Sequence, residues 1–78
     1  MKSVTLYTRE GCGLCTEAQI LLRKLNSEIP FSLALVDIDV NMEAHDRYWL
    51  RIPVVLVDGT EAASAPIDES GLRTALAE

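Results

Sequence analysis

Two cysteines near the start of the chain, Cys12 and Cys15, are the residues best suited to chemistry, and their spacing is C-x-x-C. A glycine-containing corner precedes them and a helical pattern follows, which places both thiols at a helix N-terminus. Unpaired backbone N–H groups and the positive end of the helix dipole favour a thiolate over a thiol at such a position. The pattern therefore predicts a reactive pair of sulfur atoms.

The two cysteines are expected to have different roles because they lie at different depths in the helix. Cys12 stands at or just before the first helical residue, so we expect it to have the lower pKa and to attack a substrate disulfide. Cys15 lies one turn further in, and we expect it to be more buried and to attack the mixed disulfide. Arg9 adds positive charge nearby, whereas Glu10 and Glu17 oppose it.

Other interpretations of the cysteine pair stay open at this point. The thiols could be buried and inert, or they could form half of a metal site. A structural zinc site needs four ligands, and the remaining candidates are His45 and carboxylates on a different element. A purely structural disulfide explains the pair poorly, because a bridge that encloses two residues removes little entropy from the unfolded chain.

The composition fits a single domain over residues 1–78, with 49% hydrophobic residues and therefore enough material for a small core. Seven basic and twelve acidic residues give a net charge of −5, which argues against binding to nucleic acid or to an anionic membrane. The apolar runs are far shorter than the roughly 20 residues that cross a bilayer. The first residues lack the pattern of a secretory signal, so we expect a cytoplasmic protein.

The elements that position the cysteines can be predicted from hydrophobic spacing. Residues 4–7 predict a buried strand, residues 26–30 a loop, and residues 31–36 a central strand covered on both faces. Between the first strand and the loop lies the helix that carries the cysteines, and Ile20 should be exposed on it. Its predicted apolar face consists of Leu14, Ala18, Leu21, Leu22 and Leu25.

The acidic stretch at residues 37–41 is predicted to be a turn that leads into a short helix. Asp39 or Asn41 is the expected N-cap, and the helix should end at about Leu50. Its inward side chains are predicted to be Met42, Trp49 and Tyr48.

The last third of the chain predicts a hairpin and a helix. Residues 54–57 form a strand, Asp58 and Gly59 supply a two-residue turn, and residues 60–64 return as an antiparallel edge strand. Pro66 and Asp68 mark the start of the final helix, with Asp68 as its cap. The resulting order is β-α-β-α-β-β-α, an α/β fold with a four-stranded mixed sheet and helices on both faces.

This order, the C-x-x-C pair and the Ile-Pro before the third strand resemble the glutaredoxin and thioredoxin family. The segments YTREGCGLCTEA and RIPVVLVDGTE are most similar to small bacterial glutaredoxin-like proteins. The resemblance covers nearly the whole chain and implies a thioredoxin-like fold. It also implies a thiol–disulfide oxidoreductase with Cys12 as nucleophile and Cys15 as resolving thiol, in agreement with the redox signature of C-x-x-C beside a βαβ pattern.

The resemblance extends to the segment that contains Ile52 and Pro53. In thioredoxin-like folds the matching proline is cis and faces the cysteines, and the backbone of the preceding residue is free to pair with an extended substrate. By resemblance, Ile52 and Pro53 would form this substrate platform. A trans proline that opens a strand stays open as the alternative.

The resemblance also bears on glutathione. Glutaredoxins hold it with a basic residue before the active loop, which Arg9 matches, and with a Gly-Gly-Asp segment before the last helix. Here Ala65, Pro66 and Ile67 replace the glycines, and only Asp68 could contribute. Between the cysteines, Gly13 and Leu14 stand where relatives often carry a proline, and we expect both to contact substrate.

Two classes of function follow. The first is a cytoplasmic, monomeric thiol–disulfide oxidoreductase without a tightly bound cofactor or metal, whose partner is a disulfide-containing protein or a small thiol such as glutathione. The second is a non-catalytic thioredoxin-like module that binds a partner, or an iron–sulfur cluster shared across a dimer. Disulfide turnover by a colourless monomer separates the first from the second.

Overall fold

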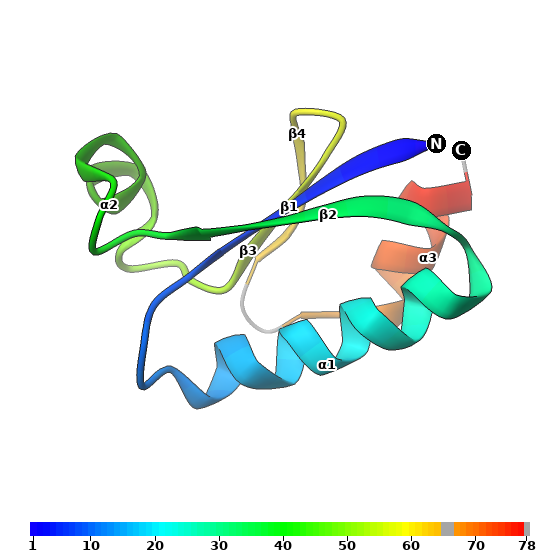
Figure 1. Cartoon of the computed structure of the whole chain (residues 1–78), viewed down its shortest axis with the longest axis horizontal. Coiled ribbons are helices and arrows are strands. Elements are labelled where there is room, and N and C mark those ends of the chain that lie inside the picture. The colour runs from blue at the N-terminus through cyan, green and yellow to red at the C-terminus, as the bar shows by residue number, and fades with distance from the viewer. Residues whose placement is uncertain (65–66, 78) are drawn as a thin grey trace.

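The computed structural model describes residues 1–64 and 67–77. Its four strands form one mixed sheet in the order β2-β1-β3-β4 (Figure 1). The predicted order β-α-β-α-β-β-α is confirmed. The elements are β1 Lys2–Thr8, α1 Gly13–Glu28, β2 Phe31–Asp37, α2 Met42–Tyr48, β3 Val54–Val57, β4 Thr60–Ser64 and α3 Glu69–Ala77.

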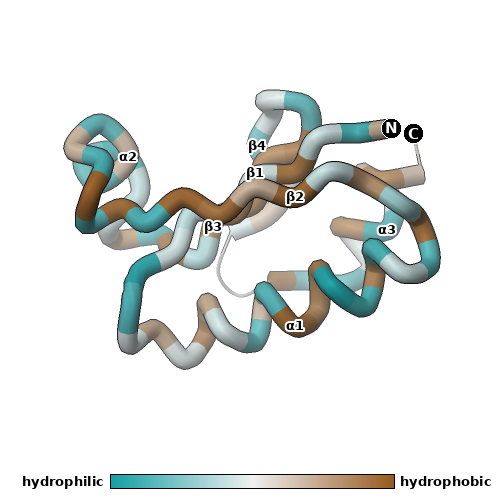
Figure 2. The backbone as a smooth tube through the Cα atoms, in the orientation of Figure 1, coloured by the Kyte–Doolittle hydropathy of each residue, from teal (hydrophilic) through white to brown (hydrophobic). Residues whose placement is uncertain are grey.

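Strand β1 is central in the sheet, because it pairs with β2 in parallel and with β3 in antiparallel register. Side chains alternate between the faces of a strand, and Val4 and Leu6 are therefore buried on the same face. They belong to one core with Leu22 of α1 and Leu72 of α3. Helices α1 and α3 lie together on this side of the sheet (Figure 1), and hydrophobic residues concentrate in the strands (Figure 2).

The prediction that residues 31–36 form a central strand covered on both faces is wrong. Strand β2 lies at the edge of the sheet, and Phe31 is its only buried residue. Leu35 is 46% exposed. An unbroken apolar run is typical of two-sided burial, but α1 and α3 pack on one face only, and they leave the outward side chains of β2 in contact with solvent.

Helix α1 continues to Glu28, three residues beyond the predicted end. Its buried side chains are Cys15, Ala18, Leu22 and Leu25. The prediction that Leu14 packs on this face is wrong, since Leu14 is 56% exposed; Cys15 takes the inward position in the first turn instead. Ile20 is exposed, as predicted.

Helix α2 is shorter and more exposed than predicted. Asn41 is its N-cap, and the side-chain oxygen accepts the N–H of Ala44 at 3.0 Å. Met42 and Trp49 do not pack inward, because they are 84% and 51% exposed. The helix contacts the sheet through Tyr48, whose ring lies on that of Tyr7 with centroids 4.4 Å apart. Because successive side chains of β1 alternate, this contact lies on the face opposite Val4 and Leu6, so the predicted helices on both faces are present.

The hairpin is confirmed, with Asp58 and Gly59 at positive φ between β3 and the edge strand β4. Asp68 caps α3, as predicted, while Pro66 lies outside the described residues. Among the helices of residues 1–64 and 67–77, none has the length and hydropathy to cross a membrane.

Candidate active site

A disulfide joins Cys12 and Cys15, whose Cα atoms lie 5.2 Å apart. Cys12 is the N-cap of α1, and Cys15 is the third residue of the helix. The backbone N–H of Cys15 donates to the Sγ atom of Cys12 at 3.1 Å. The sulfur therefore occupies the position that a capping oxygen usually takes, and it is already directed at a free helix amide.

The two sulfur-bearing residues differ in exposure. Cys15 is buried, with 2% of its surface exposed, whereas Cys12 is partly exposed. Gly11 adopts a φ of +82° just before this pair, a conformation that favours glycine, and it turns the chain from the β1 side into α1. A thiol from outside the protein can therefore approach Cys12 more readily than Cys15. The predicted difference in depth is confirmed.

Gly13 and Leu14, between the cysteines, are both exposed. A Cβ atom added to Gly13 would have no neighbouring atom within 4 Å. The predicted contact of these residues with substrate stays a prediction.

Arg9 does not stand as an isolated cation beside the cysteines. Its guanidinium forms a two-pronged pair with Asp39, with Nη2–Oδ1 at 2.8 Å and Nε–Oδ2 at 3.3 Å. The sequence assigned Asp39 to a turn or cap and missed this contact. The predicted parallel pairing of the first two strands could have indicated this contact. Thr8 of β1 pairs with Asp37 of β2, so the residues that follow the two strands meet at one edge of the sheet.

The peptide bond between Ile52 and Pro53 is cis, as the resemblance implied. The expectation that the Ile52 backbone is free is wrong for its N–H group, which donates to the carbonyl of Tyr48 at 3.0 Å. The Arg51 N–H donates to the same carbonyl at 2.7 Å. An extended substrate would therefore have to use the Ile52 carbonyl group or displace a hydrogen bond.

Asp68 uses its carboxylate within α3, where it accepts the N–H of Ser70 at 3.1 Å. This is the capping role considered from the sequence. Ala65 and Pro66, part of the segment compared with the glutathione-binding glycines, lie outside the described residues.

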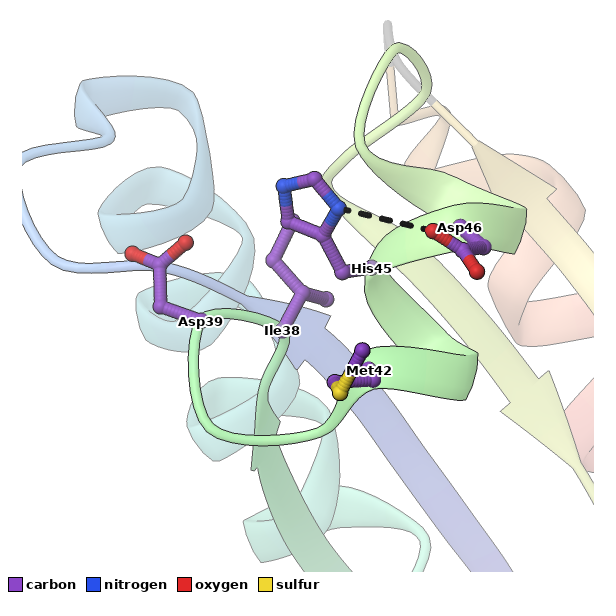
Figure 3. A pocket seen from close by; sticks show the side chains of 5 residues that line it. All are labelled: Ile38, Asp39, Met42, His45 and Asp46. Carbon is purple, nitrogen blue, oxygen red and sulfur yellow. Dashed lines mark ion pairs between the residues drawn. The ribbon is translucent and has the colours of Figure 1, made fainter.

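A cavity of about 220 Å³ lies between the loop after β2 and α2 (Figure 3). Its lining includes Asp39, Met42, His45 and Asp46. His45 lies 4.0 Å from Asp46 and its ring stacks parallel to that of Trp49. Within residues 1–64 and 67–77, no three His, Cys, Asp or Glu residues are grouped to hold a metal ion.

Comparison with known proteins identifies a family and sequence relatives. The model of the glutaredoxin-like domain family (DUF836) matches residues 3–77. The uncharacterized protein Rv0508 of Mycobacterium tuberculosis is 37% identical over 79 residues, which cover 95% of this chain and 81% of that protein.

Solved structures give the same result for the fold. Protein Ne2328 from Nitrosomonas europaea has a TM-score of 0.82 and 29% identity, with 94% of this chain and 88% of that chain covered. The protein XcR50 from X. campestris has a TM-score of 0.79 and 32% identity, with 95% of each chain covered. A thioredoxin mutant from Halobacterium salinarum has a TM-score of 0.73 at 20% identity, over 96% of this chain and 71% of that chain, and supports the thioredoxin-like fold.

Proposed function

This chain belongs to the glutaredoxin-like domain family, and we propose that it is a thiol–disulfide oxidoreductase with Cys12 as nucleophile and Cys15 as resolving thiol. The observation that supports this most strongly is the position of the disulfide: Cys12 is a partly exposed N-cap whose sulfur accepts a helix N–H, and Cys15 is buried beside it. A sulfur that carries negative charge is stabilised at such a position by the amide and by the helix dipole.

The proposed reaction starts from the reduced protein. The Cys12 thiolate attacks one sulfur of a substrate disulfide, a Cys12–substrate disulfide forms, and the other substrate sulfur leaves as a thiolate that takes up a proton. Cys15 then loses its proton and attacks Cys12 Sγ. The Cys12–Cys15 bond forms and the second substrate thiol is released, so that the substrate gains two electrons and two protons.

The burial of Cys15 favours the order in which the two cysteines react. Because Cys15 is 2% exposed, an external disulfide meets Cys12 first. The Cα atoms of the two cysteines are already at bonding separation, 5.2 Å apart, and this lies within the usual range for a disulfide. Resolution is therefore an intramolecular attack with little rearrangement.

We propose that the partner is a disulfide-containing protein or a small thiol such as glutathione. We also propose that this protein is cytoplasmic and monomeric and has no tightly bound cofactor. The exposed Gly13 and Leu14 are proposed to contact the substrate beside Cys12. Ile52 and Pro53 are proposed to contact an extended substrate through the Ile52 carbonyl group, since the Ile52 N–H is already used. Asp68 is proposed to support α3 rather than to bind glutathione.

The test is a pair of matched substitutions, Cys12→Ser and Cys15→Ser, assayed for reduction of a protein disulfide with dithiothreitol as electron donor. Cys12→Ser should abolish turnover. Cys15→Ser should accumulate a mixed disulfide with the substrate, detectable by mass spectrometry. Full activity of Cys12→Ser would refute the assigned roles, and absence of turnover by the wild-type protein with several disulfide substrates would refute the proposed function.

A further inference from the structure

The sequence around the disulfide carries more acidic than basic residues. Arg9 is the only basic residue between Thr8 and Leu22, whereas Glu10 and Glu17 are both acidic and exposed. The chain as a whole carries a net charge of −5. Arg9 is therefore the basic residue nearest to Cys12 in the sequence.

The Asp39 carboxylate is paired with the guanidinium of Arg9. The two side chains meet through two hydrogen bonds, at 2.8 Å and 3.3 Å. Two-pronged pairing fixes the guanidinium more firmly than a single contact does. About two fifths of each side chain remains exposed, so the pair faces solvent, and it presents less net positive charge to an approaching thiol than an unpaired guanidinium would.

The position of Asp39 is held by other contacts, independently of Arg9. The Asp39 N–H donates to the Asp37 carboxylate at 2.8 Å, and the neighbouring Ile38 N–H donates to the Thr8 carbonyl at 2.9 Å. Figure 3 shows Asp39 on this loop, beside the cavity lined by α2. The backbone therefore presents the carboxylate to the loop that precedes Cys12, and a change at the Asp39 side chain need not move the loop.

We propose that Asp39 is a specificity-determining residue: by neutralising Arg9 it makes the Cys12–Cys15 disulfide react more slowly with anionic thiols than with neutral or cationic thiols. This inference rests on the proposed function. It implies that the preferred electron donor is a neutral or cationic dithiol, or a protein with positive charge around its thiol, rather than a small anionic thiol such as glutathione.

The reaction in question is the reduction of the oxidised protein. A donor thiolate attacks Cys12 Sγ, the Cys12–Cys15 bond breaks, and the Cys15 thiolate takes up a proton. A second donor thiol then attacks the mixed disulfide, releases the oxidised donor as a disulfide and leaves Cys12 reduced. Two donor thiols are thereby oxidised for each protein disulfide reduced.

The size of the effect follows from screened electrostatics. At physiological salt, a unit charge changes the rate for a singly charged reagent at an exposed reaction centre by roughly 1.2-fold from about 10 Å and by roughly twofold from about 5 Å. Because the thiolate is the attacking species, glutathione reacts with a net charge of about −2 and cysteamine with a net charge of about zero. A nearby charge therefore changes the glutathione rate and leaves the cysteamine rate nearly unchanged. We therefore expect the ratio of the glutathione rate to the cysteamine rate to change by roughly 1.5-fold to fourfold for each charge that is altered.

The test measures reduction of the oxidised protein by glutathione, which is anionic, by cysteamine, which is cationic, and by neutral dithiothreitol, with alkylation and mass spectrometry as readout. Asp39→Asn should raise the glutathione-to-cysteamine ratio, and Arg9→Gln should lower it. Asp46→Asn is the matched control, because Asp46 lines the same cavity but pairs with His45 and not with Arg9, and its ratio should change less than that of Asp39→Asn. The intrinsic reactivity of each thiol cancels when variants are compared.

Shifts of the glutathione-to-cysteamine ratio in opposite directions for Asp39→Asn and Arg9→Gln would support the inference. These shifts should diminish at 0.5 M salt, where the Debye length is roughly 4–5 Å. Equal ratios in all variants, or shifts of the same sign for Asp39→Asn and Arg9→Gln, would overturn it. General damage to the fold changes the rates with all three donors together and leaves the ratio in place. A wild-type protein that is reduced but turns over no disulfide substrate contradicts the proposed function alone, since the donor ratios can still be measured.

Discussion

Leu22→Ala tests whether α1 is held in place by its buried face. Leu22 is completely buried in the core that joins α1 to the sheet and to α3. Removing a buried leucine side chain costs about 3 kcal/mol, the sum of lost transfer free energy and a residual cavity. A domain of this size has a total free energy of unfolding of roughly 4–12 kcal/mol. The variant should therefore lose a quarter or more of its stability.

Leu14→Ala is the matched control on the same helix. The same atoms are removed, but Leu14 is 56% exposed, so the cost should be at most about 0.5 kcal/mol. Urea unfolding of both oxidised variants, followed by circular dichroism, gives the difference directly. Leu22→Ala should also lower the midpoint of thermal unfolding by at least about 10 °C. Equal losses in the two variants would show that the inward and outward faces of α1 are assigned wrongly.

Two further predictions concern charge and backbone geometry. The Arg73 side chain donates to Glu69 and lowers its pKa below the usual 4.5, an effect that partial burial opposes and that Lys24 reinforces. This carboxylate therefore contributes stability that is present above pH 4.5 and is lost as the pH falls through its lowered pKa. The difference in thermal midpoint between the wild type and Glu69→Gln should shrink as the pH is lowered from 7 to 3. A constant difference would contradict the assignment. Gly59→Ala should cost about 1 kcal/mol in urea unfolding, because Gly59 has a φ of +84°. Gly13→Ala, at a helical position with open space, should leave stability unchanged or slightly higher, and equal costs at the two sites would contradict this reasoning.

The parts of the fold that are set by local rules could be predicted from the sequence. The Asp58–Gly59 turn, the caps at Asn41 and Asp68 and the placement of Cys12 at the start of a helix all depend on the preferences of one or two residues. Each is present in the structure. The difference in exposure between Cys12 and Cys15 follows in the same way from helical geometry.

Features that depend on which elements lie next to each other could not be predicted in this way. An apolar run such as Phe31–Val36 is compatible with a central or an edge strand, and only the strand order places it at the edge. Met42 and Trp49 have the side chains of core residues, but α2 is short and contacts the sheet through Tyr48. The hydrophobicity of a side chain shows that it could be buried, but whether it is buried depends on the elements that pack against it.

Arg9 is a residue near the cysteines whose contact with a distant element is not evident from its local sequence alone. Counted along the chain, Arg9 is a cation three residues before Cys12, and its charge should assist a thiolate and attract anions. In the folded protein Asp39, thirty residues away in the sequence, forms two hydrogen bonds with it, because the parallel pairing of β1 and β2 brings the ends of both strands together. Whether the Arg9 guanidinium is paired thus depends on strand register. If this is correct, relatives with the same C-x-x-C pair but a neutral residue at the position of Asp39 should accept glutathione more readily than this protein does.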